Sequence, residues 1–594
     1  MFAATLRLGI VQYPRQILPN QFHQSVLQGL SRVSISSYHI VRLVEGVIIA
    51  SLQSAVILSM PNYSSAGTSS HDPYNGLEVE NITEVLCEKR GETQAQGTSS
   101  RTLVATATGA DLCCTGNSYG HAITINMFPD DVLLAIFDSC RKDRDPGWST
   151  FTTVWGWHRL VLGLVHVCQR WRQLIFGSPR HLDLQLPCTH GIPMRKNLGC
   201  WPPFPIAIQY NRGNILTLSD EDSLFAALEH PDRVRHVDLC LLGSQIGEVV
   251  TVMQVPFPAL TRLTLRWEEE RPPAFPSGFL GGSAPYLRYL HLEGILFPTL
   301  PTLLSSTSDL VNLSLDGIAQ DAYISPEAMV ACLAALPKLK FLLIGFQLAT
   351  SRPDRIRPPP VTRTVVPSLI SFEFHGASEY LEDLVARIDS PQLDQIYIQY
   401  LDQFLDFRIA QLFKFIDRSE DPDLTLIRHA DVTFSHEWVT FKMYPCPESH
   451  LVWSSVYALI YCQWIERQIS HIAQVFSQPS AMLSRVVHLK LSRDQAYADC
   501  HGDEWLHLLR QFSAVRTLHV ARRFAAGHIA LALEGVTTEM VAEVLPVLDL
   551  IYLDGQPVSS VEKFLAARQL SGHPVTVVDT EAEFYERVKS YVSE

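Results

Sequence analysis

The residues of this chain that could do chemistry are histidines, cysteines and acidic side chains, and none of them falls into a pattern typical of catalysis. The 594 residues contain no G-x-x-x-x-G-K-[ST], no G-x-G-x-x-G after a strand, no G-x-S-x-G and no H-E-x-x-H. Acidic residues 268–270 are typical of a solvated face. The sequence therefore predicts no active site and no enzyme. The frequent histidines lie inside helix or strand patterns, as do His121, His166, His236, His291 and His375.

Cysteine spacing gives no sign of a metal site. Cys113 and Cys114 are adjacent, and the pair Cys188 and His190 has no matching second pair. Structural zinc sites draw their ligands from two spaced pairs, so we expect neither a metal nor another cofactor. The 12 cysteines show no regular spacing, which is typical of reduced, mostly buried thiols in an intracellular protein rather than of a disulfide framework.

Composition indicates a globular protein of two or three domains, because 47% of residues are hydrophobic and 18% charged over 594 residues. A net charge of −14 disfavours nucleic acids and anionic membranes as general partners. Residues 43–60 are the one membrane candidate, but Glu45 and Gln53 interrupt them. We expect a buried or surface-docked helix there, with a membrane anchor as the weaker alternative. The early Arg7 and Pro14 argue against a signal peptide, so the predicted location is cytoplasmic or nuclear.

Residues 125–186 carry the most specific pattern of elements. Phe128-Pro129 predicts a helix start, because proline suits the first helical position, and acidic residues follow in the first turn. An apolar stripe then recurs at three- and four-residue spacing. A second helical pattern runs from Leu160 to Ile175 and stops at residues 177–179 (GSP). Residues 181–186 alternate like a strand.

This segment resembles an F-box, whose hallmarks are a Phe-Pro start, an Ile-Phe pair and Val-Cys-x-x-Trp. Here these are 128–129, 136–137 and 167–171. The link at 141–159 is longer than the family's, and an ordinary helical hairpin is the alternative. The resemblance implies binding to the small cullin adaptor of a Skp–cullin–F-box ubiquitin ligase. The implied adaptor-facing or supporting residues are Phe128, Pro129, Val132, Leu133, Ile136, Phe137, Leu164, Val165, Val167, Cys168 and Trp171.

A repeat follows the helical segment. The pattern L-x-x-L-x-L, with apolar substitutes, starts at residues 234, 260, 287, 310, 339, 369 and 393, and again at 486, 515 and 548. A period of 20–30 residues predicts a leucine-rich-repeat solenoid with one short strand per unit. The asparagine that usually follows the strand is missing, since Glu268, Ile295, Ile318 and Gln347 take its place, so the solenoid should be irregular.

The stretch at 402–485 is too long for ordinary repeats and predicts an insertion. Within it, residues 431–445 alternate like a β-hairpin, and 459–476 show a long helical pattern. Together with the segment at 195–210, the chain resembles F-box-like proteins numerous in mushroom-forming fungi. The predicted fold is α/β: a poorly ordered extension at 1–122, an F-box-like domain at 123–186 and a curved, irregular solenoid at 200–580.

The resemblance implies a substrate receptor, which does no chemistry itself and brings a target protein to the ligase. In each strand the third and fifth residues should point away from the core. They would form an aromatic stripe for an unknown target, or lie under a return loop. The alternative function is a repeat scaffold without ligase association; an unrecognised hydrolase ranks last. The predicted target-binding residues are Tyr289, His291, Phe341, Leu343 and Tyr397.

Overall fold

The structure is a computed structural model that describes two compact units of the chain. The first takes in residues up to Leu186 together with Cys200–Phe204, and the second Pro187–Gly199 with Pro205–Glu594. The predicted extension at 1–122, with its candidate helix at 43–60, lies outside the described residues. The described residues are 128–142, 163–179, 181–210, 216–240, 243–267, 275–347, 362–401, 409–419, 426–445, 455–461, 468–478, 482–493, 502–521, 526–537, 539–553 and 558–578.

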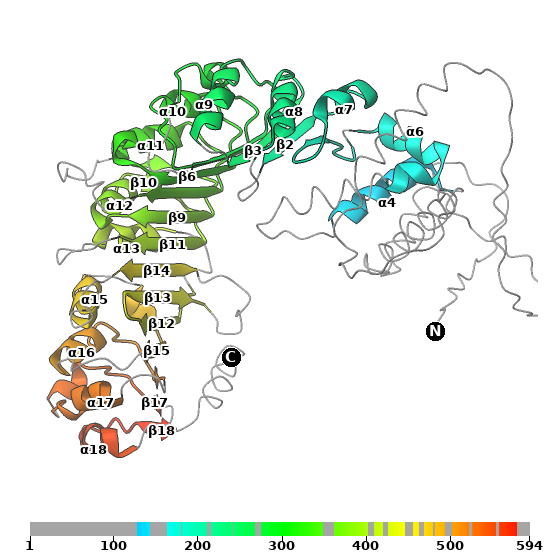
Figure 1. The fold of residues 1–594 in the computed structure, drawn as a ribbon. Helices are drawn as coiled ribbons and strands as arrows, with labels where there is room; N and C mark the ends of the chain where they lie inside the picture. The colour runs from blue at the N-terminus through cyan, green and yellow to red at the C-terminus, as the bar shows by residue number, and fades with distance from the viewer. Residues whose placement is uncertain are drawn as a thin grey trace, which may run out of the picture. The chain divides into compact units, whose positions relative to one another are not determined.

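A 16-stranded sheet forms the second unit's frame (Figure 1). Every neighbouring pair from β2 to β18 is parallel except the two that β13 makes. The predicted α/β class, with a sheet dominated by parallel strands, is therefore confirmed. In spatial order the strands are β1 (Leu186–Cys188), β2 (Ile206–Tyr210), β3 (Val234–Cys240), β4 (Arg262–Arg266), β5 (Tyr289–Glu293), β6 (Asn312–Ile318), β7 (Phe341–Phe346), β9 (Ser371–Gly376), β11 (Gln395–Tyr400), β14 (Val456–Tyr461), β13 (Trp438–Tyr444), β12 (His429–Phe434), β15 (His488–Arg493), β16 (Thr517–Val520), β17 (Leu550–Leu553) and β18 (Thr576–Val578).

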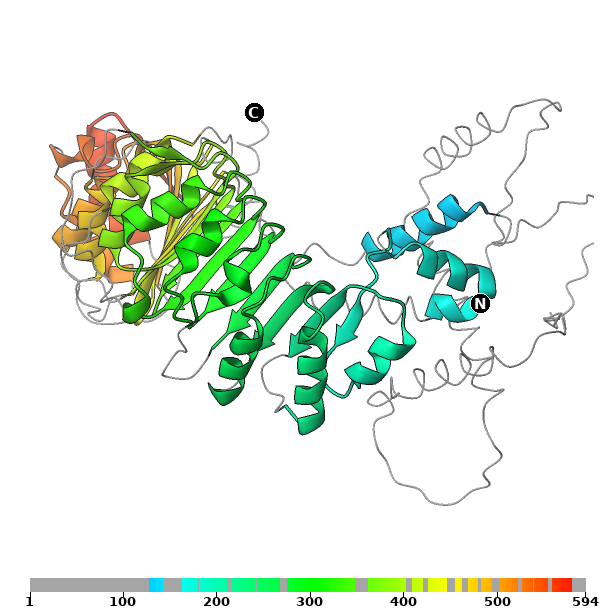
Figure 2. The same ribbon diagram turned by 90° about the horizontal axis from the view of Figure 1, so that it is seen from above.

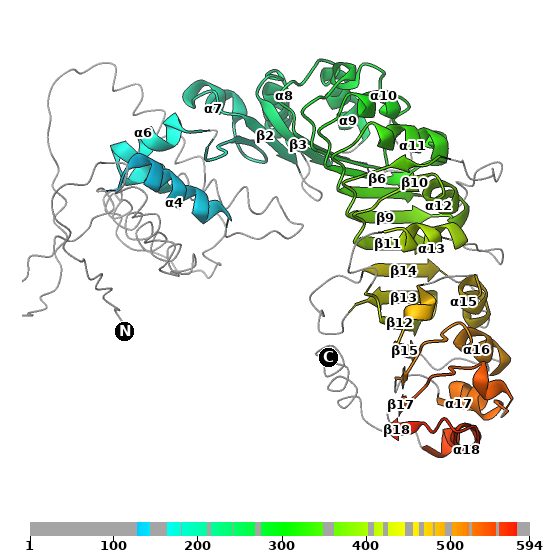
Figure 3. The same cartoon turned by 180° about the vertical axis from the view of Figure 1, so that it is seen from behind.

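Between most successive parallel strands, a helix returns the chain to the start of the next strand. Figures 1, 2 and 3 show the helices from α9 to α18 on one side of the sheet. The two-residue strands β8 (Thr364–Val365) and β10 (Ile388–Asp389) pair with each other apart from the main sheet. The helices are α7 (Met194–Cys200), α8 (Leu218–Leu228), α9 (Gly243–Val252), α10 (Leu300–Ser305), α11 (Pro326–Ala334), α12 (Ser378–Val385), α13 (Ala410–Asp417), α15 (Gln468–Phe476), α16 (Gly502–Leu509), α17 (Ala526–Glu534) and α18 (Glu562–Leu570).

Each predicted L-x-x-L-x-L segment contains a strand, and its first, fourth and sixth residues are buried. In the segment starting at 260, Leu260, Leu263 and Leu265 are at most 1% exposed. Except at 234, the strand begins at the third residue, because the first lies in a turn: Leu260 N donates to Phe257 O at 3.1 Å. Burying one leucine side chain contributes about 1.5–3 kcal/mol, so each repeat adds several such contributions to the stability of the sheet unit.

A row of backbone hydrogen bonds joins successive turns just before the strands. Thr261 N donates to Arg235 O at 2.9 Å, Arg288 N to Thr261 O at 2.8 Å, and Val311 N to Arg288 O at 2.8 Å. Lys340 N continues the row to Val311 O. Because each bond joins the same position of two repeats, the repeats stay in register before any strand begins.

Backbone contacts replace the missing asparagines at the other end of the strands. Ile295 and Ile318, which occupy two of the expected asparagine positions, are buried apolar residues. Trp267 N donates to Glu293 O, and Gly294 N to Asp316 O, both at 2.9 Å. Gly294 has a φ of +64°, and a β-carbon there would meet Trp267 O. Turn-to-turn backbone bonds therefore satisfy groups that an asparagine ladder would otherwise bind.

The predicted insertion at 402–485 contributes strands to the main sheet. The predicted hairpin at 431–445 is confirmed, since β12 and β13 pair antiparallel. The predicted helix from 459 is wrong at its start: residues 456–461 form β14, residues 462–467 lie outside the described residues, and α15 spans Gln468–Phe476. VYALIY alternates buried and half-buried residues, and β14 pairs with both β11 and β13. Tertiary pairing of this short alternating run outweighs the helical spacing that overlaps it.

The described residues of the first unit are helical where helical patterns were predicted, with one difference. α4 (Asp130–Lys142) begins just after Pro129 and has acidic residues in its first turn. The second pattern is split: residues 163–167 are helical, and α6 (Gln169–Gly177) starts anew after Cys168. Cys168 is extended and its Sγ accepts from Trp171 N at 3.5 Å, so it caps α6. Among the described residues, no helix is long and apolar enough to cross a membrane.

We predict that Gly294→Ala destabilises the sheet unit, because alanine disfavours this φ and its β-carbon would strike the Trp267 carbonyl. The expected loss in free energy of unfolding is about 1–3 kcal/mol, measured by urea denaturation. Gly247→Ala is the control: Gly247 lies in α9 with nothing within 4 Å of the added carbon, so helix propensity should leave stability equal or up to about 1 kcal/mol higher. Equal effects of the two substitutions would contradict the account of the turns.

Candidate functional site

The helices α4 and α6 of the first unit close around an aromatic core. Phe137 of α4 and Trp171 of α6 meet edge to face, with ring centroids 5.0 Å apart, and both are at most 1% exposed. Arg170 binds the start of α4, donating to Asp130 Oδ1 at 2.7 Å and to Phe128 O at 2.6 Å. Aromatic burial fixes how the helices pack, and the arginine fixes where α4 begins.

Burial divides the predicted adaptor-facing residues into two sets. Those that hold the helices together are buried: Leu133, Phe137, Leu164, Val165 and Trp171. Those that keep some exposed surface are Phe128, Pro129, Val132, Ile136, Val167 and Cys168. Sequence could not make this separation, because one apolar stripe supplies both the core and its border. A direct contact between a partner and the buried set would require the helices to open.

On the sheet, the predicted target-binding residues lie on the side opposite the buried leucines but do not form a continuous stripe. Each keeps partial exposure. Tyr289 and His291 belong to β5, Phe341 and Leu343 to β7 two strands further, and Tyr397 to β11 two strands beyond that. The intervening strands place polar residues in the same rows: Asn312 and Ser314 on β6, Ser371 and Glu373 on β9. The expected aromatic stripe is therefore an alternation of aromatic, aliphatic and polar groups.

Tyr397 has an aromatic neighbour that sequence reasoning missed. Its ring stacks on Tyr457 of β14, with centroids 4.6 Å apart and planes 5° from parallel. Lys442 Nζ of β13 lies 5.5 Å from the centroid of the Tyr457 ring. The missed signal was the alternation of residues 456–461, which puts Tyr457 in register with Tyr397.

A charge network crosses β3, β4 and β5 on the same side of the sheet. Arg266 lies 3.6 Å from Asp238 and 3.9 Å from Glu293, measured between nitrogen and oxygen. Asp238 is 1% exposed, and desolvation raises the pKa of its carboxyl although Arg266 acts in the opposite direction. A buried acid of this kind is tolerated only beside a cation, which ties Arg266 to its place.

Ser314, His291 and Glu293 have the connectivity of a nucleophile, a base and an orienting acid. His291 Nδ1 lies 2.7 Å from Ser314 Oγ, and His291 Nε2 lies 3.6 Å from Glu293 Oε2. Ser314 is 7% exposed. The backbone N–H groups around it are engaged in the parallel ladders of β6 with β5 and β7, and so are not available to stabilise an oxyanion. The geometry fits a polar network better than acyl transfer.

A glycine makes room for an ion pair between two strands that are not direct neighbours. Asp316 of β6 and His375 of β9 belong to strands that have β7 between them, yet His375 Nδ1 lies 3.5 Å from Asp316 Oδ1. Gly345 of β7 lies between them, and a β-carbon there would overlap Asp316 Oδ1. His375 Nε2 also lies 3.0 Å from Glu373 Oε1. Desolvation acts to lower the pKa of His375, but the hydrogen bonds to Asp316 and Glu373 outweigh it and raise that pKa to about 9.

Cys188 and His190, the pair considered as metal ligands, make contacts that stabilise the fold. Cys188 Sγ donates to Ser223 O at 3.4 Å, and burial raises the pKa of this thiol to about 12. His190 lies 3.3 Å from Asp220, which belongs to the capping box of α8. In the part of the chain described, no group of histidines, cysteines and acids could hold a metal ion. Residues 113, 114, 121 and 268–270 lie outside the described residues.

One expectation about the cysteines is wrong. Cys168, Cys188 and Cys332 are free thiols, as predicted. Cys200 is disulfide-bonded. Irregular spacing argues against a framework of several bridges, but it does not exclude one bridge, since pairing depends on distance in the fold.

We predict that Leu133→Ala combined with Phe137→Ala opens the helical core. Each large-to-small change in a buried core costs about 2–5 kcal/mol. Hydrogen–deuterium exchange of the full chain should show loss of protection in α4 and α6, with the sheet unaffected because contacts within repeat arrays are between neighbours. Val132→Ala, at a half-buried position, should change protection much less. Unchanged exchange in the double variant would contradict the assignment of both residues to the core.

We predict that His375 stabilises the fold at neutral pH and not at high pH. Its folded pKa of about 9 lies above the ordinary 6.5, so its contribution is full below about pH 6.5 and is lost as pH rises through 9. His375→Gln should lower the melting temperature at pH 6.5 and leave it unchanged near pH 10. His436→Gln is the control, because His436 and Glu437 form an exposed pair, worth little. A pH-independent effect of His375→Gln would contradict this.

Comparison with protein-family models and with curated proteins gave no match for this chain.

Proposed function

We propose that this chain is a substrate receptor of a Skp–cullin–F-box ubiquitin ligase. In this proposal the first unit is an F-box that binds the cullin adaptor, and the second is an irregular, curved leucine-rich-repeat solenoid that binds a target protein. The observation that carries it is the helical pair closed by Phe137 and Trp171, which leaves part of Phe128, Pro129 and Val132 exposed at one helix start. Apolar side chains left exposed on a small helical module favour a partner.

The repeat architecture supports the second half of the proposal. One strand per repeat, buried leucines at the first, fourth and sixth positions, and a row of turn-to-turn hydrogen bonds are what a leucine-rich-repeat solenoid requires. The opposite side of the sheet carries charged and aromatic residues, among them Arg266, His291 and Tyr397. Aromatic residues and arginine are enriched where proteins bind one another.

The mechanism would be proximity rather than covalent chemistry by this chain. The adaptor holds the receptor on the ligase, and the receptor holds the target, so the target's lysines stay at a high effective concentration near the ubiquitin-charged enzyme. No residue of the receptor has to change protonation state or form a bond for this to work.

A specific observation favours a second candidate, a repeat scaffold without ligase association. Five of the eleven residues first proposed for the adaptor surface, Leu133, Phe137, Leu164, Val165 and Trp171, are buried within the helices. The apolar surface left for an adaptor is correspondingly smaller. The scaffold would keep the same fold and the same sheet face but would not bind the adaptor.

The test replaces half-buried residues at the border of the helical core and leaves the fully buried ones in place. Phe128→Ala with Val132→Glu should weaken binding of the Skp-type adaptor at least a hundredfold by calorimetry, since burying one large apolar side chain is worth about 1.5–3 kcal/mol and 1.4 kcal/mol corresponds to tenfold. Gln173→Ala, an exposed change on α6, should leave the affinity unaltered. If the double variant still binds the adaptor, the interface lies elsewhere on the chain. If the unaltered chain does not bind the adaptor, the scaffold function is favoured.

A further inference from the structure

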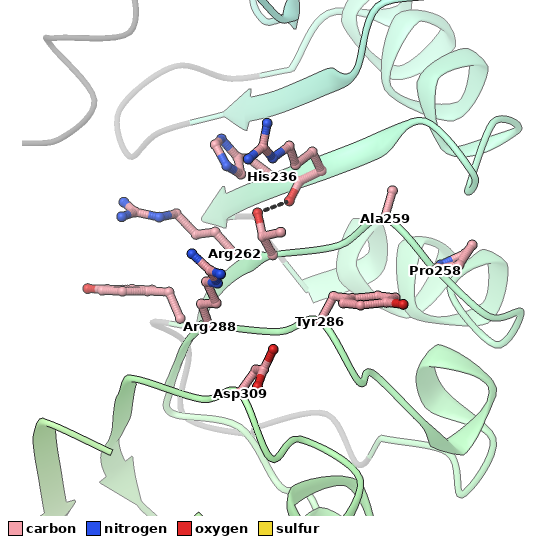
Figure 4. Close-up of a pocket in the computed structure, with 10 residues that line it drawn as sticks. His236, Pro258, Ala259, Arg262, Tyr286, Arg288 and Asp309 are labelled. Carbon is pink, nitrogen blue, oxygen red and sulfur yellow. Dashed lines mark hydrogen bonds between the residues drawn. The ribbon is translucent and has the colours of Figure 1, made fainter. Parts of the chain in front are cut away.

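A pocket of about 500 Å³ lies at the edge of the sheet where β3, β4 and β5 begin. We call it the basic pocket. Figure 4 shows His236, Arg262 and Arg288 one after another along this edge, with Tyr286 and Asp309 beside Arg288. Three arginines are among its lining residues, which are Arg235, His236, Pro258, Ala259, Thr261, Arg262, Tyr286, Arg288, Tyr289 and Asp309.

The repeat brings these cations together from distant parts of the sequence. The second and third residues of three successive repeats are Arg235-His236, Thr261-Arg262 and Arg288-Tyr289. His236 pairs in register with Arg262, and Arg262 with Tyr289. Neighbouring strands lie about 4.8 Å apart, so side chains 26 or 27 residues apart in the chain share one small volume. The second-position backbones are joined by the bonds Thr261 N to Arg235 O and Arg288 N to Thr261 O.

The charge of the basic pocket is positive although the whole chain carries −14. Three guanidinium groups face one carboxylate, which leaves a net +2 with His236 counted as neutral. That carboxylate, on Asp309, already accepts a hydrogen bond from Lys338 Nζ at 2.6 Å. Asp238 lies two residues after His236 in β3, and it interacts with both Arg262 and Arg266. Among the described residues, the two acids next to the pocket are thus shared with other cations.

Arg262 is held in a way that suits recognition of a planar or tetrahedral anion. Its guanidinium carbon lies 4.3 Å from the centroid of the Tyr289 ring. Desolvation lowers the pKa of Arg262, with Tyr289 and Asp238 acting in the opposite direction. A guanidinium that is partly withdrawn from water and fixed by stacking forms stronger charge-assisted hydrogen bonds than a freely moving one.

We propose that the basic pocket binds a phosphate monoester, carried by a phosphorylated side chain or by a small phosphorylated molecule. A phosphate monoester carries about −1.5 to −2 charge near pH 7 and has three acceptor oxygens, which match the +2 of the pocket and its forked donors. A single carboxylate would satisfy half of that charge. The pocket is lined by residues of the sheet unit alone, so this inference does not depend on the ligase proposal, although Tyr289 also belongs to the proposed target-binding face.

The test is calorimetric titration of the full chain with a short phosphoserine peptide, its serine and glutamate forms, and glycerol phosphate. We expect the phosphoserine peptide to bind at least tenfold more tightly than the glutamate form, and the serine form not to bind. Glycerol phosphate binding as tightly as the peptide would assign the pocket to a small molecule, and tighter peptide binding would assign it to a phosphorylated protein. Either result supports the proposal.

Arg288 is the residue to change, because it is exposed and its loss should not disturb folding. Arg288→Ala should weaken phosphopeptide binding at least tenfold, and Arg288→Lys less, since an ammonium cannot form the paired hydrogen bonds of a guanidinium. Arg516→Ala is a matched control: Arg516 holds the same repeat position before β16, lies outside the pocket and is 3.5 Å from Asp549. Its affinity should equal that of the unaltered chain.

Three results would overturn the proposal. One is no phosphopeptide binding at millimolar concentration. The second is an equal loss of affinity in Arg288→Ala and Arg516→Ala, which would indicate general attraction rather than a site. The third is a single-stranded oligonucleotide, a phosphate diester, binding as tightly as the monoester and losing affinity in Arg288→Ala.

Discussion

In-register parallel pairing of successive strands is the constraint on which the rest of the sheet unit depends. Because of this pairing, residues at the same position of successive repeats, 23 to 30 apart in sequence, lie side by side on adjacent strands. The leucines of the first, fourth and sixth positions meet in the core for this reason. The same pairing gathers Arg235, Arg262 and Arg288 at one edge, and it places Asp316 and His375 on either side of Gly345.

Register is maintained twice over, by the leucines and by the backbone. A one-residue slip would move every buried leucine to the opposite side of the sheet. The turn-to-turn bonds before the strands and those at Trp267 and Gly294 after them would break as well. Even the insertion keeps this register, because β14 continues the parallel pairing from β11 and β12 passes it on to β15, with only β13 reversed.

Much of this frame could be predicted from the sequence, because periodic leucines report burial directly. All ten repeat segments contain strands, and the hairpin at 431–445 was found from its alternation. β14 was missed because a six-residue alternating run overlaps a longer helical spacing. The basic pocket was missed for a different reason: Arg235 and Arg288 occupy variable positions of the repeat, and only the pairing of strands makes them neighbours.

In the helical unit too, the sequence predicts the elements but not which of their residues are buried. The apolar stripe correctly indicated α4, but could not tell Leu133 and Phe137, which are buried, from Val132, which is half-buried. Cys168 was grouped with an unbroken helix, whereas it caps a new one. Such distinctions depend on how the two helices pack against each other, which spacing along one helix does not contain.

We propose that this chain works as the receptor of a ligase, and purification from native extract is the decisive measurement. The full chain, recovered under mild conditions, should carry the Skp-type adaptor and the cullin in near-equal amounts. Recovery of the intact chain without the adaptor, under conditions in which an F-box protein from the same extract retains it, would contradict the proposal.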